Sequence, residues 1–73
     1  MKTATIRSTD AVFTIIMERD SELYQRGGFG LRLLERTKAL GEQQLEYLHV
    51  DDEVTAHKTF NTLVRMVQDF AWK

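Results

Sequence analysis

The sequence has no cysteine and no proline among its 73 residues. Because it lacks cysteine, the chain can form neither a disulfide nor a thiolate zinc site, two common ways to reinforce a small core. A domain of this size buries only about 60% of the surface of its unfolded chain. We therefore expect either efficient packing or association with another chain. The lack of cysteine also fits a cytoplasmic protein.

The chain also lacks a strong net charge and a long hydrophobic run. The formal net charge is −1, so nothing draws the whole molecule toward nucleic acid or a membrane surface. The longest strongly apolar run, Ala11 to Met17, covers seven residues and is too short to span a bilayer. No small-residue cleavage site follows it, so we expect no signal peptide. A hydrophobic content of 42% and a charged content of 29% are typical of a globular chain, expected to form a single domain over residues 1–73.

Two strands are expected near the N-terminus. Polar and apolar residues alternate over residues 3–7, which is the period of a β-strand. Residues 8–10, Ser-Thr-Asp, have short oxygen-bearing side chains that favour a turn. Residues 11–18 are rich in β-branched and aromatic types, which favour a second strand paired with the first as a hairpin. The alternative is a helix over residues 10–26, capped by Asp10 and stopped by the glycine that follows.

The middle of the chain predicts a helix and then a third strand. Residues 31–40 are mostly good helix formers, and Gly41 is a typical residue for a helix end. Side chains alternate in character over residues 44–50, which predicts a strand. With the C-terminal helix described next, the expected fold is α+β with the element order β-β-α-β-α.

Residues 51–72 carry the clearest pattern. At 100° per residue, seven apolar side chains fall within one arc of about 120°. They are Ala56, Phe60, Leu63, Val64, Val67, Phe70 and Ala71. The opposite face is polar and holds Lys58, Thr62, Arg65 and Asp69. Asp51 is expected to cap this helix, with Asp52 and Glu53 near the positive end of its dipole. We predict an amphipathic helix packed on the small sheet, with Val54 and Trp72 pointing away from the apolar arc.

Three of the four residues 27–30, Gly-Gly-Phe-Gly, are glycine. Glycines before a helix let backbone N–H groups converge on an anion, and Arg32 and Arg36 follow closely. However, the stretch lacks the spacing of a dinucleotide-binding loop and the lysine and hydroxyl of a nucleotide P-loop. We interpret it as a connector whose glycines allow positive φ, with Phe29 as its anchor.

Charge is divided between two neighbouring stretches. Residues 26–38 hold four basic residues and one acidic residue, a balance of +3, and residues 42–53 hold five acidic residues and no basic one, a balance of −5. The two stretches form an ordinary solvated surface, neutralise each other within the fold or between protomers, or form opposite patches that steer a partner.

The two histidines lie near the acidic residues 51–53. Glu53 and His57 are four residues apart and share a helix face, but the remaining groups have no spacing typical of metal ligands. No pairing of a nucleophile with a general base stands out. We therefore expect no metal, no cofactor and no catalytic residue, and we expect that the protein is not an enzyme.

The first functional hypothesis is a non-catalytic protein-binding module. A chain this small can block a partner's site but has little room to build its own, as in small inhibitors or regulatory proteins, for example phage or mobile-element ones, that dock on a larger assembly. Rigid aromatic side chains and arginine are favoured at binding interfaces. The expected contact residues are Tyr24, Phe29, Arg32, Arg36 and Trp72. The partner is expected to be another protein or a second copy of the chain, with no membrane involved.

The alternative is a dimeric DNA-binding regulator or antitoxin. Over about forty residues the chain resembles ribbon-helix-helix repressors, in which an N-terminal strand enters the major groove. The resemblance implies base contacts from the polar face of the strand, namely Thr3, Thr5 and Arg7. It also requires helices over residues 10–26 and 31–40, so a hairpin over residues 3–18 excludes this architecture.

Overall fold

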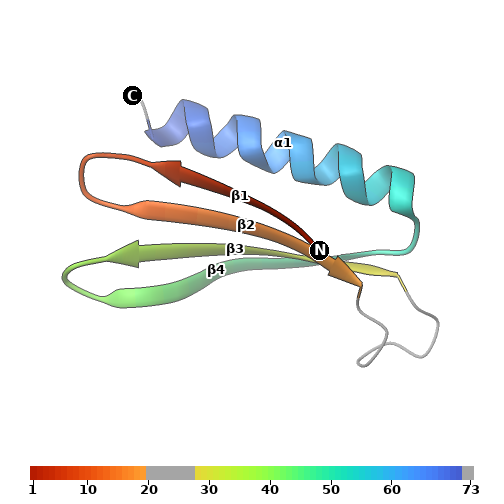
Figure 1. Cartoon of the computed structure of the whole chain (residues 1–73), viewed down its shortest axis with the longest axis horizontal. Coiled ribbons are helices and arrows are strands. Elements are labelled where there is room, and N and C mark those ends of the chain that lie inside the picture. The colour runs from red at the N-terminus through yellow and green to blue at the C-terminus, as the bar shows by residue number, and fades with distance from the viewer. Residues whose placement is uncertain (20–27, 72–73) are drawn as a thin grey trace.

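A computed structural model describes residues 1–19 and 28–71 (Figure 1). Its elements in chain order are β1 (Lys2–Arg7), β2 (Val12–Arg19), β3 (Phe29–Thr37), β4 (Gly41–Val50) and α1 (Glu53–Ala71). The four strands form one antiparallel sheet in the order β1-β2-β3-β4. The α+β class is therefore confirmed, but the predicted order β-β-α-β-α is wrong, because four strands precede the helix.

The N-terminal hairpin is confirmed. In the register of β1 and β2, Ile6 lies opposite Phe13 and Lys2 lies opposite Met17. The turn is closed by the backbone N–H of Ser8, which donates to the carbonyl oxygen of Ala11 at 2.9 Å. The alternative helix over residues 10–26 is wrong where the structure describes it, since residues 12–19 are a strand. The ribbon-helix-helix architecture is not formed.

The predicted helix over residues 31–40 is also wrong. Most of this range belongs to β3, and the rest forms the turn to β4. Leu31, which is 1% exposed, lies opposite Met17 of β2 and Leu48 of β4. Pairing on both sides therefore outweighs the intrinsic helix preference of leucine, arginine and glutamate, which is only a weak determinant. Gly41, expected to end a helix, instead has a positive φ of 71° and opens β4.

The third predicted strand is confirmed and begins earlier than expected, at Gly41 instead of residue 44. A register shift interrupts its pairing with β3 between Leu33 and Leu34. Leu45 of β4 has no partner in the register at this point, which is the pattern of a β-bulge.

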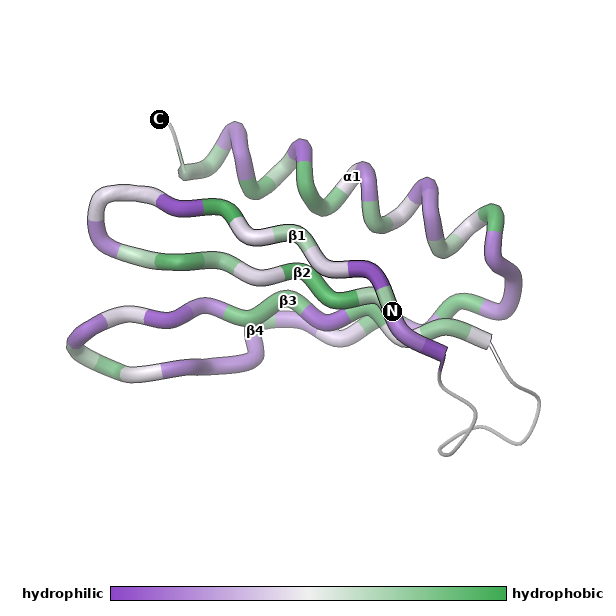
Figure 2. The backbone as a smooth tube through the Cα atoms, in the orientation of Figure 1, coloured by the Kyte–Doolittle hydropathy of each residue, from purple (hydrophilic) through white to green (hydrophobic). Residues whose placement is uncertain are grey.

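The core lies between α1 and one face of the sheet. Its buried hydrophobic side chains are Ile6, Phe13, Ile15, Met17, Leu31, Ala56, Phe60 and Val67. Side chains alternate along a strand, so the strand residues between the buried ones point to the opposite face of the sheet. We call this opposite face the open face. Hydrophobic residues concentrate in β2 and in part of β3, while the turn end of the β3–β4 hairpin is mainly hydrophilic (Figure 2). The helix lies chiefly over β1 and β2, and less over β3 and β4.

The C-terminal helix is confirmed over Glu53–Ala71, and residue 72 lies outside the described part. Asp52, and not Asp51 as predicted, caps it. The backbone N–H of Thr55 donates to Asp52 Oδ1 at 3.3 Å, and the Thr55 hydroxyl donates to Oδ2 at 2.8 Å. The carbonyl oxygen of Asp52 also accepts from the N–H of Ala56 at 3.0 Å. The bond from the Thr55 N–H satisfies a backbone donor that a helix start leaves without a partner.

Candidate functional site

The five predicted contact residues do not form one surface. Tyr24 and Trp72 lie outside the described residues. Phe29 is half-buried on the helix-facing side, where it packs against the core. Arg32 and Arg36 are at even positions of the same strand, so their side chains are on the open face. The structure therefore separates the aromatic anchor from both arginines by the thickness of the sheet.

Arg32 is engaged by a neighbour on the open face. Its Nε lies 3.4 Å from Glu18 Oε1, and the two side chains are 37% and 39% exposed. This Nε is buried and makes no hydrogen bond within the described part of the chain, so the contact is an ion pair without hydrogen-bond geometry. The charge of Arg32 is therefore partly balanced by a neighbour within the sheet.

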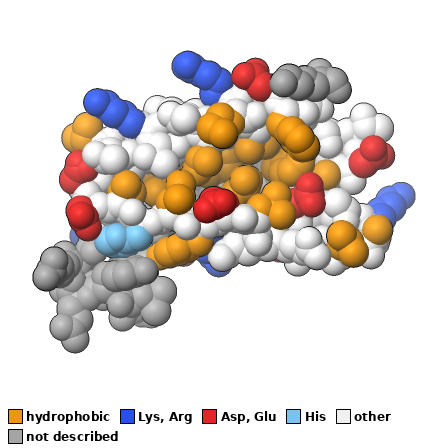
Figure 3. All heavy atoms as spheres, turned by 180° about the vertical axis from the view of Figure 1, so that it is seen from behind, with side chains coloured by type: hydrophobic (Ala, Val, Ile, Leu, Met, Phe, Trp, Pro, Cys, Tyr) orange, Lys and Arg blue, Asp and Glu red, His pale blue; other side chains and the backbone are white. Residues whose placement is uncertain are grey.

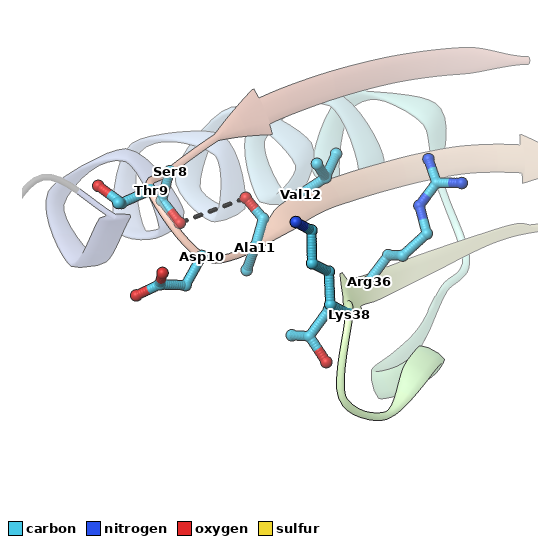
Figure 4. Close-up of a pocket in the computed structure, with 8 residues that line it drawn as sticks. Ser8, Thr9, Asp10, Ala11, Val12, Arg36 and Lys38 are labelled. Atoms are coloured by element: carbon cyan, nitrogen blue, oxygen red, sulfur yellow. Dashed lines mark hydrogen bonds between the residues drawn. The ribbon is translucent and has the colours of Figure 1, made fainter.

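Arg36 lies at an open hollow of about 400 Å³ between the two hairpin turns (Figure 4). The hollow is lined by Ser8, Thr9, Asp10, Ala11, Val12, Arg36, Thr37 and Lys38. The amino group of Lys38 is directed toward the β1–β2 turn, whereas the guanidinium of Arg36 extends away from it along the sheet (Figure 4). The two cations diverge, so they do not converge on a single anion.

The predicted acid and imidazole groups are likewise dispersed. His57 Nε2 is 3.6 Å from Glu53 Oε1, and its Nδ1 is 3.4 Å from Lys2 Nζ. His49 Nδ1 is 3.8 Å from Asp51 Oδ1, at the end of β4. Within residues 1–19 and 28–71, no group of three or more His, Cys, Asp or Glu side chains is placed to hold a metal ion.

The second half of the glycine-rich stretch, Phe29 and Gly30, already belongs to β3, so the stretch does not lead into a helix. Gly28 adopts a φ of 111°, as expected for a connector glycine. A Cβ at this position would lie 2.7 Å from Nε2 of His49 and 2.9 Å from the carbonyl oxygen of Val50. A glycine therefore lets the backbone at residue 28 approach the end of β4 closely.

The two charged stretches lie side by side because β3 pairs with β4. Arg36 is directly opposite Glu42 in the register. No ion pair joins the two stretches among the described residues, whose ion pairs are Arg32–Glu18, His49–Asp51 and His57–Glu53.

The helix carries exposed apolar side chains on one flank. At 100° per residue, Leu63, Met66 and Phe70 lie on one side of the buried line of the helix, and His57 lies on the other. Because His57 contacts Lys2 of β1, the first flank faces β3 and β4. Met66 is 61% exposed and Phe70 is 69% exposed, while Leu63 is half-buried.

The sheet continues this apolar surface. Leu33 of β3 is on the helix-facing side, directly opposite Ile15 of the core, and is half-buried. We name Leu33, Leu63, Met66 and Phe70 the apolar strip. Figure 3 shows hydrophobic side chains gathered in a band across this side of the molecule.

The apolar strip is exposed because one helix is narrower than a four-stranded sheet. Four strands spaced about 4.8 Å apart place the outer strand axes about 14 Å from each other. One helix, with side chains, is about 10 Å wide. A single helix lying over β1 and β2 therefore leaves the helix-facing side of β3 and β4 incompletely covered.

The free edge of β4 is less suited to binding than the apolar strip. An exposed edge strand offers unpaired backbone groups to another strand, but bulges and charged side chains hinder such pairing. Residues 41–46 of β4 are all exposed. They include Glu42, Glu46 and the bulge at Leu45.

The sequence contained a signal for the apolar strip that the prediction did not use. Phe70 was assigned to the buried arc, although it is mostly exposed, and Met66 was not considered. The two residues are four apart at one margin of the arc, so they form a contiguous pair on the helix surface.

No family model, curated protein or solved structure matches this chain. In the described part of the chain, no helix is both long enough and apolar enough to cross a bilayer.

Proposed function

We propose that the protein is a non-catalytic protein-binding module, a small inhibitor or regulatory protein that docks through its apolar strip. The observation that carries this proposal is the exposure of Met66 and Phe70, at 61% and 69%, beside the incompletely covered half of the sheet. Large contiguous apolar patches on the surface of a folded protein often mark a binding site.

Several features support binding at this surface. Phenylalanine and methionine are enriched in the cores of protein interfaces. Met66 and Phe70 project from a helix, which holds them in a fixed relation to Leu63 and Leu33. A rigid arrangement of this kind lowers the entropy lost on binding. The strip offers contact area and no reacting group, which is why we propose docking in place of catalysis.

The proposal can be tested by site-specific photo-cross-linking. A photoreactive phenylalanine analogue is placed at Met66, and a matched analogue is placed at Val54. Val54 is a suitable control because it is also an exposed apolar residue of α1, 64% exposed, but points away from the strip. We expect a discrete protein adduct from position 66 in host lysate and none from position 54.

Two other results would count against the proposal. Identical adducts from both positions would show that contact is not specific to the strip. Adducts that disappear after nuclease treatment would indicate a nucleic-acid partner instead of a protein.

A further inference from the structure

Two carboxylates flank the sheet part of the apolar strip. Glu46 of β4 lies directly opposite Leu33 in the register, and Glu35 follows Leu33 two positions along β3. Both are therefore on the helix-facing side, where neighbours of this kind are about 5–8 Å apart between Cβ atoms. Glu46 is exposed and Glu35 is half-buried.

Neither carboxylate forms an ion pair with a cation of residues 1–19 or 28–71. The ion pairs of the described residues involve Glu18, Asp51 and Glu53 as the acids, so Glu35 and Glu46 remain without one. On α1, Lys58 and Arg65 lie on the polar face predicted from the sequence, and both are exposed. Figure 3 shows acidic side chains among the hydrophobic ones on this side, with lysine and arginine at the periphery.

We propose that the apolar strip binds a protein segment in which apolar side chains are flanked by lysine or arginine. This inference rests on the proposed function and adds the charge of the partner. A basic side chain placed beside Leu33 would lie near both Glu35 and Glu46 and could form an ion pair with each. Such complementarity raises association rates and excludes acidic competitors.

Other occupants fit this charge pattern less well. In a symmetric dimer through the strip, each copy would present Glu35 and Glu46 to the same surface of the other, because a two-fold interface pairs a patch with itself. Nucleic acid and anionic lipid would be repelled, since both are bound through positive charge.

The test uses the full chain and two synthetic peptides of about 15 residues with the same amphipathic pattern. One peptide is built from leucine and lysine, and the other from leucine and glutamate. Binding is measured by fluorescence anisotropy at low salt and located by amide chemical shifts. We expect the Leu/Lys peptide to bind and to shift signals at the strip, and the Leu/Glu peptide not to bind.

Two double variants separate charge from apolar contact. Glu35→Gln with Glu46→Gln should weaken Leu/Lys binding about fivefold, as expected for the loss of two ion pairs at the protein surface. Asp10→Asn with Glu42→Gln makes the same change of net charge, using a turn residue and an open-face residue, and should leave affinity within twofold.

The outcomes distinguish this inference from the proposed function. Absence of Leu/Lys binding, equal binding of both peptides, or equal effects of the two double variants overturns the inference. If Met66→Ser with Phe70→Ser abolishes peptide binding while Glu35→Gln with Glu46→Gln does not weaken it, the apolar surface stands and its proposed charge selectivity fails. If only the carboxylate variants reduce binding, the peptide is held by charge alone and the proposed apolar docking fails.

Discussion

The ring of Phe70 stands edge-on to the ring of Phe13, with centroids 6.1 Å apart and an interplanar angle of 87°. Phe13 is buried in the core, whereas Phe70 is mostly exposed. The pair therefore joins the core of the domain to its apolar strip. Contact with the buried ring of Phe13 therefore orients the exposed ring of Phe70, although Phe70 is not part of the core.

This relationship predicts unequal costs for truncating the two rings. Phe13→Ala removes a buried ring and should lower the free energy of unfolding by about 3–5 kcal/mol. Phe70→Ala loses chiefly the edge-to-face contact and should cost about 0.5–1.5 kcal/mol. Urea denaturation followed by circular dichroism measures both. Equal losses would show that Phe70 belongs to the core.

The two glycines with positive φ should differ in their tolerance of alanine. Gly28→Ala meets both a φ of 111° and a Cβ contact of 2.7 Å with the ring of His49. It should cost at least about 1–3 kcal/mol, the usual range for backbone strain.

Gly41→Ala meets nothing within 4 Å at a φ of 71°. It should cost about 1–2 kcal/mol, the usual penalty of the left-handed conformation. Gly41→Asn should cost less, because asparagine tolerates this conformation. Thermal unfolding of the three variants measures these losses of stability. A smaller loss of stability for Gly28→Ala than for Gly41→Ala would contradict the close packing described at Gly28.

The cap of α1 gives a third prediction. Asp52→Ala removes two hydrogen bonds from Thr55, one to each carboxylate oxygen. We expect a loss of about 0.5–2 kcal/mol of stability. Asp69→Ala, an exposed acidic residue in the last turns of the same helix, should change stability by less than about 0.5 kcal/mol. If Asp52→Ala were equally mild, the cap would contribute little to the helix.

The ion pair on the open face should be weak and sensitive to salt. Glu18→Gln removes the charge that faces Arg32, and because both side chains are more than a third exposed, the loss should be about 0.2–1 kcal/mol. The difference from the original protein should shrink at about 1 M salt, where the screening length is about 3 Å. A loss that is independent of salt would mean that glutamate contributes by packing and not by charge.

Sequence reasoning identified the elements whose pattern is local. The hairpin of β1 and β2 follows from alternation and β-branched content, and α1 follows from its amphipathic period. It failed at β3, because Leu31 and its neighbours favour a helix until strands on both sides supply pairing partners. The pairing of β3 with β2 and β4 is a tertiary interaction, and it cannot be predicted from the composition of residues 31–40 alone.

The binding surface was harder to predict than the fold. Phe29 and Arg32 looked like neighbours, but strand geometry places them on opposite faces, and this was hidden as long as residues 31–40 were assigned to a helix. Phe70 looked buried because its position in the helical arc is apolar. The exposure of Phe70 depends on how many strands one helix can cover. It therefore depends on the presence of a fourth strand, which was not predicted.

The most direct test of the account is a paired affinity capture from host lysate, run with nuclease present. The original chain and Val54→Ser should both retain a stoichiometric protein partner, and Met66→Ser with Phe70→Ser should lose it while remaining folded by circular dichroism. Retention of the same partner by the folded double variant would contradict the claim that the apolar strip is the docking surface.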